Sequence, residues 1–330
     1  MAKTIAEVIY VYGAKVLYQH LSAMQAEVVG VKRGDDIEYI HRMRVASRRL
    51  RSVLKIFKDC FPKADYKTFN RDIRAVTQVL GHARDLDVQL EILKKNLPGY
   101  FNPKLKPGVK RLKLRLKQKR QLLQVEVVQA MSRLEQTDTL GRIAGWATPW
   151  LEKELSDYRD TTVLFQLAAL NIRSRLKELM EYDQLVRVES NVTELHEMRI
   201  HAKQLRYTME AFEELYGFPI TPFINQTRKI QALLGSIHDT DVWMRMIPVF
   251  IEEEEQRITN CFGNNRRLRR LLPGLSAFST ERKLSRDEKY QEFIAFWDET
   301  LETGVWDELI FLIGNPQSPA DLFSPCAESS

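Results

Sequence analysis

The sequence contains few of the residues that build covalent or metal-bound frameworks. Its 330 residues include three cysteines, Cys60, Cys261 and Cys326, which lie far apart along the chain. An odd number of cysteines, without CxxC spacing or a Cys/His cluster, argues against a disulfide scaffold and against a zinc site. We therefore expect a reducing compartment, no metal ligands and no cofactor.

Long apolar runs are also missing. Nowhere do about 18 apolar residues follow one another, as a membrane-spanning helix would require. The stretch MAKTIAEVIYVYGAKVLYQHL at the start carries an acid and polar breaks, which a signal peptide lacks. These features predict a soluble cytoplasmic protein that makes no membrane contact.

Motifs of nucleophilic catalysis and of phosphate loops are absent as well. The sequence has no GxSxG, no P-loop and no HExxH. Aspartates two apart in RDLD and IHDTD leave a metal-dependent phosphohydrolase as an alternative. However, Asp85 and Asp239 each follow a Leu-Gly pair and precede an apolar run, so we expect them to cap helices. The sequence thus favours a non-catalytic protein.

What the chain does contain is helical periodicity, while strand-like alternation is scarce. Amphipathic helices are predicted at 3–29, 37–59, 64–80, 85–96, 108–136, 140–157, 162–183, 192–215, 221–234, 240–256 and 281–301. Glycines and prolines mark the predicted breaks, among them Gly81 and Gly235. The fold is therefore predicted to be all-α.

Two sequence blocks recur in the same order. His41, Met43, Arg44, Leu50, Arg51 and Phe57 reappear 155 positions later as His196, Met198, Arg199, Leu205, Arg206 and Phe212. LGHARDLDV at 80–88 then matches LGSIHDTDV at 234–242. The double match predicts a duplicated helical unit, with the halves at 1–157 and 158–310 related by a pseudo-twofold axis. A C-terminal tail is expected at 311–330.

The first block holds a strip of cations, HRMRVASRRLR at 41–51, with no acid. On a helix, Arg44, Arg48, Arg51 and Lys55 fall within about 80° of His41. The second copy aligns His196, Arg199, Lys203 and Arg206 in the same way. Arg49 lies beside the first strip and has Gln204 as its counterpart. Related by symmetry, the two strips could line one groove.

An ordinary solvated helix face is the alternative explanation for such a strip. A ligand is favoured because the first strip lacks acids at the salt-bridge spacing, and because the same face recurs with a histidine at the same place. Evenly spaced cations suit a long anion, and arginine pairs well with phosphate. Nucleic acid remains a competitor, but no aromatic residue interleaves the cations from 41 to 51 to stack on bases.

Two further basic runs strengthen the case for an anionic ligand. KLKPGVKRLKLRLKQKR at 104–120 contains no acid, and NNRRLRR at 264–270 occupies a similar place in the second half. The cations of the first run surround their helix, so only some can face a ligand and the others are solvated. We include Arg111 and Arg115 among the expected contacts.

The duplicated H-x-M-R-x3-(R/K)-x-L-R and L-G-x3-D-x-D-V motifs resemble those of the CHAD family, the conserved histidine α-helical domains. The resemblance implies one domain over 1–310, made of two four-helix bundles with a central basic groove. It also implies binding of inorganic polyphosphate and association with polyphosphate granules. The implied contacts are His41, Arg44, Arg48, Arg51, His196, Arg199, Lys203 and Arg206, with Arg49 less regular.

Two features lie outside this resemblance. His238 stands where the first half has Arg84, so the two ends of the groove are expected to bind unequally. The segment with Trp297, Trp306 and LIFLI at 309–313 leaves a protein-recruiting scaffold as a further alternative, although core packing explains these residues equally well. Protein partners are not indicated by the sequence.

Overall fold

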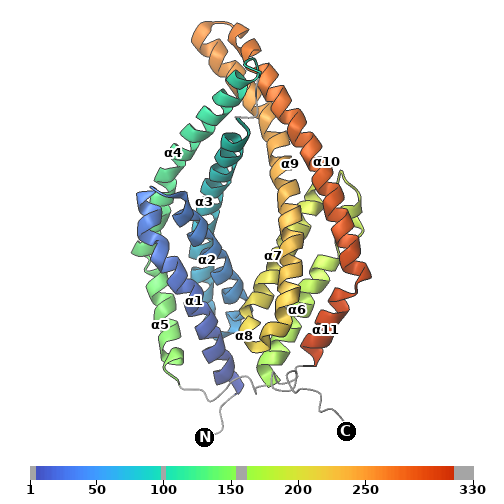
Figure 1. Ribbon diagram of the computed structural model, residues 1–330. Helices are drawn as coiled ribbons and strands as arrows, with labels where there is room; N and C mark the ends of the chain where they lie inside the picture. Colours follow the sequence, from blue (N-terminus) through green and yellow to red (C-terminus); the bar gives the residue numbers. More distant parts are fainter. Residues whose placement is uncertain (1–4, 98–101, 154–161, 316–330) are drawn as a thin grey trace, which may run out of the picture.

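A computed structural model describes residues 5–97, 102–153 and 162–315 (Figure 1). These residues form helices and contain no strand, so the all-α prediction is confirmed. The first half contains α1 Ile5–Arg33, α2 Ile37–Ile56, α3 Lys63–Asn96, α4 Lys106–Gln136 and α5 Thr139–Leu151. The second contains α6 Thr162–Met180, α7 Val192–Ala211, α8 Glu213–Tyr216, α9 Thr221–Phe262, α10 Leu272–Glu302 and α11 Val305–Gly314. Short 3-10 turns are η1 Lys58–Cys60, η4 Leu185–Arg187, η5 Phe218–Ile220 and η6 Arg266–Arg270.

The helices follow one another in space in the same order in both halves. In the first, α1 packs on α2, α2 on α3 and α3 on α4; in the second, α6 packs on α7, α7 on α9 and α9 on α10. The halves contact each other through α2 and α7, and again through α4 and α10 (Figure 1). The description as two four-helix bundles about a pseudo-twofold axis stays a prediction, and its boundary at 157 and 158 lies outside the described residues.

Apolar side chains form two separate cores. The larger one spans both halves and includes Tyr12, whose hydroxyl donates a 3.0 Å hydrogen bond to the carbonyl of Ala211. The repeated motif residues Phe57 and Phe212 lie in this core with ring centroids 6.1 Å apart. The smaller core lies at the end of the molecule where α4 and α10 begin, which we call the tip. It includes Trp243 and Phe278, whose rings meet edge to face.

Two predicted helix breaks are wrong. Helices α3 and α9 each continue through the Leu-Gly pair, so Gly81 and Gly235 lie in helix interiors. A glycine costs a helix only about 1 kcal/mol, which the long buried stripe of each helix outweighs. The capping role predicted for Asp85 and Asp239 is wrong for the same reason, because neither aspartate stands at a helix start. Helix α11 also continues through 311–314, which the sequence assigned to the tail.

Two glycines allow the halves to approach closely at the tip. A Cβ atom on Gly108 would lie 2.1 Å from the carbonyl oxygen of Leu271, and one on Gly274 would lie 1.9 Å from that of Leu105. Gly108 at the start of α4 thus lies against the backbone that precedes α10, and Gly274 at the start of α10 lies against the backbone that precedes α4. Each follows a proline, which suits the first turn of a helix.

The variant Gly274→Ala is therefore expected to lose about 2 to 3 kcal/mol of the free energy of unfolding, since the added methyl group meets a backbone oxygen that cannot rotate away. Chemical denaturation measures the loss. Gly145→Ala is the control, because a Cβ there meets nothing within 4 Å on the surface of α5. A Gly274→Ala protein as stable as the unmodified one would show that the tip helices do not cross this closely.

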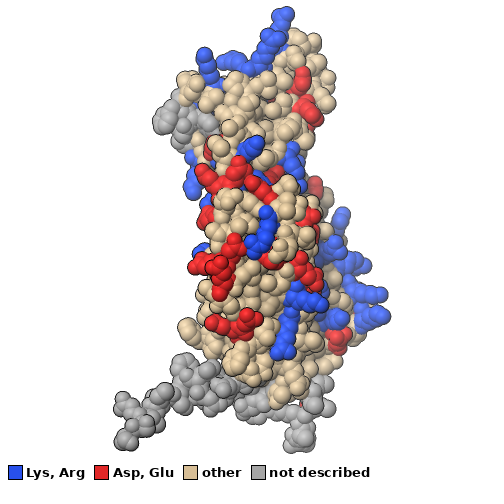
Figure 2. Space-filling model, turned by 90° about the vertical axis from the view of Figure 1, so that its right-hand side faces the viewer, with Lys and Arg blue, Asp and Glu red and all other residues tan. Residues whose placement is uncertain are grey.

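The surface charges are unevenly distributed. Figure 2, which faces the α10 side, shows Asp and Glu side chains across the middle of this face. Lys and Arg side chains gather at the tip and along one edge of the lower half. On this face positive charge is thus gathered in patches that could each attract an anion.

Candidate functional site

The two basic strips meet where α2 and α7 contact each other. Arg44 and Arg48 of α2 lie close enough to Lys203 of α7 to lower the pKa of its ammonium group. Burial lowers the pKa of the Arg199 guanidinium, and Arg48 lowers it further. Cations from both halves of the chain therefore share one site, although each repels the others.

A cavity of about 320 Å³ opens between α2, α6 and α7 beside this crossing. Its cationic lining residues are Arg48, Arg51, Lys55, Arg175 and Lys203, and no Asp or Glu lines it. Asn171 and Gln204 add amide groups. The cavity thus combines like charges and hydrogen-bond donors, which an anionic ligand would satisfy.

Arg44 and Arg199 are equivalent residues of the repeat, and each packs against one of the two glycines at which a helix break was predicted. A Cβ atom added to Gly81 of α3 would lie 3.6 Å from Nε of Arg44, and one added to Gly235 of α9 would lie 3.5 Å from Nε of Arg199. Both Nε atoms are buried without a hydrogen-bond partner, which costs about 1 to 3 kcal/mol each. The glycines therefore make room for two arginines that add little to the fold itself.

A larger side chain at Gly235 is expected to displace the Arg199 guanidinium. We predict that Gly235→Leu weakens binding of a polyanionic ligand at least about tenfold, because one charge-assisted contact is lost. Gly235→Ala is the control, since its Cβ makes an ordinary contact and also favours the helix. Equal affinities of the two variants, measured by calorimetry, would contradict a role for this packing.

The aspartates of the repeated D-x-D motif have two different roles. Oδ1 of Asp85 lies 3.7 Å from a terminal nitrogen of Arg44. Burial raises the pKa of Asp239, and the nearby Arg199 partly offsets this rise. The second aspartate of each motif is buried and pairs with an arginine of the next long helix. Arg120 donates to Asp87 at 2.8 Å, and Arg286 donates to Asp241 at 3.0 Å.

Arg120 and Arg286 were not predicted, although the sequence holds a signal for them. These arginines are 166 positions apart, and so are the L-x-P-G segments at 105–108 and 271–274. The spacing differs from that of the first two blocks because α9 continues 21 residues beyond Asp241, whereas α3 continues nine residues beyond Asp87. The sequence therefore contains a third repeat block. Its arginines, Arg120 and Arg286, hold Asp87 and Asp241 in place.

The histidines of the site are held neutral. Nδ1 of His196 lies 3.0 Å from Nδ1 of His238, and burial, followed by Arg199, lowers the pKa of His238 to about 3. Burial and then Arg84 lower the pKa of His41. A neutral imidazole can still donate one hydrogen bond, and a bound anion would raise its pKa. At the position equivalent to His238 the first half has Arg84, which lies 3.8 Å from Glu38.

Lys203 is the most strongly perturbed cation. Its side chain is buried, and this burial, followed by Arg199, Arg48 and Arg44, lowers the pKa of its ammonium group to about 6. Its equivalent in the first half is Arg48, which cannot lose its charge in the same way. The free site therefore carries less charge at neutral pH than its sequence suggests.

Two of the predicted contacts are occupied by a carboxylate that bridges the halves. Glu210 of α7 accepts a 3.1 Å hydrogen bond from Arg49 of α2 and a 2.8 Å hydrogen bond from Arg206. Arg206 also lies over the ring of Tyr207, and Arg48 lies near the same ring. Arg49 and Arg206 thus border the site and hold its two helices together.

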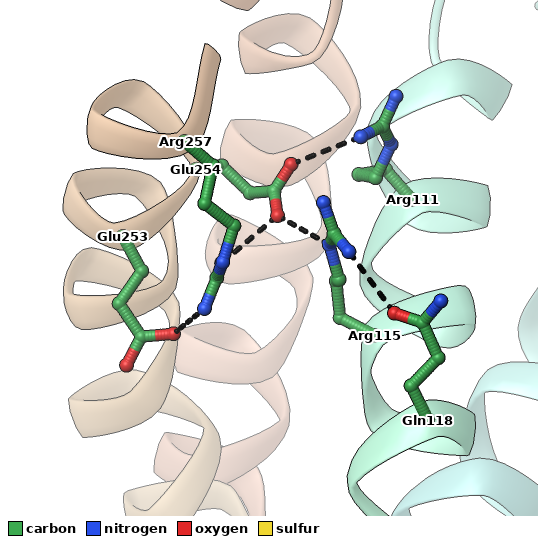
Figure 3. A network of polar contacts seen from close by, with 6 residues as sticks. All are labelled: Arg111, Arg115, Gln118, Glu253, Glu254 and Arg257. Atoms are coloured by element: carbon green, nitrogen blue, oxygen red, sulfur yellow. Dashed lines mark hydrogen bonds and ion pairs between the residues drawn. The ribbon is translucent and has the colours of Figure 1, made fainter. Parts of the chain in front are cut away.

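Arg111 and Arg115 do not join this site. Both belong to α4 at the tip, where they bind the fully buried carboxylate of Glu254 on α9 at 3.2 and 2.6 Å (Figure 3). Arg257 binds the same carboxylate at 2.9 Å. A buried carboxylate requires such partners, which explains why these arginines turn toward α9.

Two cations were missed because they lie outside the repeated motifs. Arg175 of α6 lines the cavity and donates to Gln204 at 3.1 Å, while Glu178 partly neutralises it. Arg245 of α9 lies close enough to lower the pKa values of both His196 and His238. Only the packing of α6 and α9 against α7 brings them to the site.

Within the described ranges, no group of three or more His, Cys, Asp or Glu side chains is arranged to hold a metal ion. Among the same residues, no helix is both long and apolar enough to cross a bilayer.

Comparisons with known proteins agree on one fold. The sequence matches the family model described as the CHAD domain over residues 15–248. The structure is similar to that of the CHAD domain from the plant Ricinus communis, with a TM-score of 0.65 and 21% identity, over 87% of this chain and 91% of that one. It is also similar to PptA from Streptomyces chartreusis, with a TM-score of 0.60 and 14% identity, over 89% of this chain and 99% of that one. At these identities the likeness concerns the fold alone. No curated protein matches the sequence.

Proposed function

The chain belongs to the CHAD domain family, as its repeated motifs predicted, and we propose that it binds inorganic polyphosphate where α2 and α7 meet. The polymer contacts the two strips by charge-assisted hydrogen bonds from Arg44, Arg48, Arg199 and Lys203. His41, His196 and Arg51 extend the contacts along the two helices. Binding of this kind directs the protein to polyphosphate granules and involves no catalysis.

The observation that carries this proposal is the convergence of Arg44 and Arg48 with Arg199 and Lys203, from helices of different halves. Each charge is partly desolvated, so each contributes unfavourably to the free protein. The arrangement becomes favourable when a polyanion supplies the missing negative charge. Tyr207 is the aromatic side chain that lines the adjoining cavity, and Arg48 and Arg206 already lie over its ring.

The ligand assignment is tested by titration with polyphosphate and with single-stranded DNA of equal charge at rising salt. Polyphosphate is expected to bind more tightly and to resist salt better, because the site offers cations but no free stacking surface. Stronger or more salt-resistant binding of DNA would overturn the assignment. Incubation with polyphosphate and magnesium or manganese tests the enzymatic alternative, which requires metal-dependent release of phosphate or shortening of the chain.

A further inference from the structure

The tip carries a second concentration of positive charge, remote from the α2 and α7 contact. A cavity of about 630 Å³ there is lined by four cations, Lys110, Arg111, Arg267 and Arg270, and by no acid. Lys110 and Arg111 come from α4, while Arg267 and Arg270 come from η6 in the other half of the chain. The tip cavity therefore resembles the site at the α2 and α7 contact, called the central site below, because both draw cations from the two halves of the chain.

Buried charge beneath the cavity holds one of its walls in place. Glu254 is 0% exposed and binds Arg111, Arg115 and Arg257 at once, while Glu253 accepts from Arg257 at 2.7 Å (Figure 3). Three guanidinium groups thus share two carboxylates, which leaves an excess of positive charge. The remaining wall is free of such ties, since among the described residues no ion pair involves Lys110, Arg267 or Arg270.

A line of cations connects the tip with the central site. Arg245 adjoins the His196 and His238 pair. It lines a cavity of about 690 Å³ between α4 and α9, whose charged lining residues are four cations and one acid: Arg115, Lys119, Arg245, Arg257 and Glu253. Arg115 shares Glu254 with Arg111, which lines the tip cavity. Asp239 and Glu254 are 15 positions apart on α9, so the tip lies about 22 Å beyond the central site.

From this arrangement we infer that the cavity between α4 and α9 and the tip cavity together form a second binding site for the same polyanion, which we call the second station. The inference rests on the proposed function and adds a preference for chain length. A long polyphosphate occupies the central site and the tip together, whereas a short one reaches only one of them. Linking two contacts in this way raises the affinity without any change at either.

The test removes the three unpaired cations of the tip, in the variant Lys110→Ala, Arg267→Ala and Arg270→Ala, and leaves Arg111 to hold Glu254. Calorimetry of the full chain measures the affinities for tripolyphosphate and for long-chain polyphosphate. The variant is expected to bind the long chain at least about tenfold more weakly than the unmodified protein and to bind tripolyphosphate with little change. The matched control is Lys63→Ala, Lys177→Ala and Lys283→Ala, which removes three exposed charges that line none of these cavities.

The outcomes separate this inference from the proposed function. If the tip variant and the control bind the long chain equally, the second station is excluded while the central site stands. If the unmodified protein binds neither ligand, the proposed function falls and the second station falls with it. Circular dichroism and the thermal midpoint of each variant test whether any lost affinity comes from unfolding.

Discussion

A protein that carries both Arg44→Glu and Arg199→Glu is expected to lose polyphosphate binding while it keeps its helices. The two arginines lie at equivalent places in the repeat, each against a helix glycine and each near an aspartate. Removing two charge-assisted contacts costs about 3 to 6 kcal/mol, or about 10² to 10⁴ in affinity. The new carboxylates also repel the polymer, so the measured loss should reach the upper part of this range.

Stability has to be separated from binding in this experiment. Each new glutamate lies beside Asp85 or Asp239, and like charges destabilise the fold. The variant Arg44→Gln with Arg199→Gln removes the charge without adding this repulsion and is expected to lose affinity as well, though less. Lys63→Glu with Lys177→Glu is the control for total charge, since both lysines are exposed outside the site. Retained binding in the Arg44 and Arg199 variants, with intact helix content, would remove the site from this surface.

Polyphosphate affinity is expected to fall as the pH rises from neutrality. In the free protein Lys203 has a pKa of about 6, so most of it is uncharged at neutral pH. A bound polyanion favours the ammonium form and raises this pKa, so binding takes up a proton between the two values. By linkage, the affinity changes by up to about tenfold per pH unit over that window. Calorimetry in buffers of different ionisation enthalpy measures the proton directly.

The other groups around Lys203 affect the same measurement. Arg199, Arg48 and Arg44 lower its pKa, and Asp239 raises it. Lys203→Arg keeps a charge at every pH used and reproduces the residue of the first half, Arg48, so it is expected to flatten the pH dependence. An unchanged slope in Lys203→Arg would assign the proton to another group, such as His196 or His238. The stability of the free protein has the opposite pH dependence to the affinity. Between pH values of about 6 and 10.5 the unfolded chain holds a proton on Lys203 that the folded chain has lost, so the free energy of unfolding rises with pH over this range.

The basic strips and their pairing were predictable because they depend on local periodicity and on a repeat. His41, Arg44, Arg48 and Arg51 share a helix face by spacing alone, and the second copy at His196 to Arg206 indicated the other half of the proposed site. The tertiary structure adds that the two copies adjoin. Arg175 and Arg245 could not be found in this way, since neither belongs to a repeated block.

The partners of individual charges were not predictable. Arg49, Arg111 and Arg115 have the same side chain as the strip arginines, yet they bind Glu210 and Glu254, which lie more than a hundred positions away. Helical periodicity predicts which side chains lie on the polar face of a helix. It does not predict which carboxylate of another helix will lie next to them in the folded protein. Charge runs therefore overestimate the number of cations available to a ligand.

The sequence by itself determined the all-α class, most of the helices and the family, because helical spacing and repeated motifs are properties of the chain. Only the tertiary structure decided that Gly81 and Gly235 lie inside helices and face Arg44 and Arg199. A glycine four residues before an aspartate fits a helix end better than a helix interior, so the local sequence favours a break. Which of the two it occupies depends on whether the flanking segments bury one continuous apolar stripe against other helices, and that contact forms only when the chain folds.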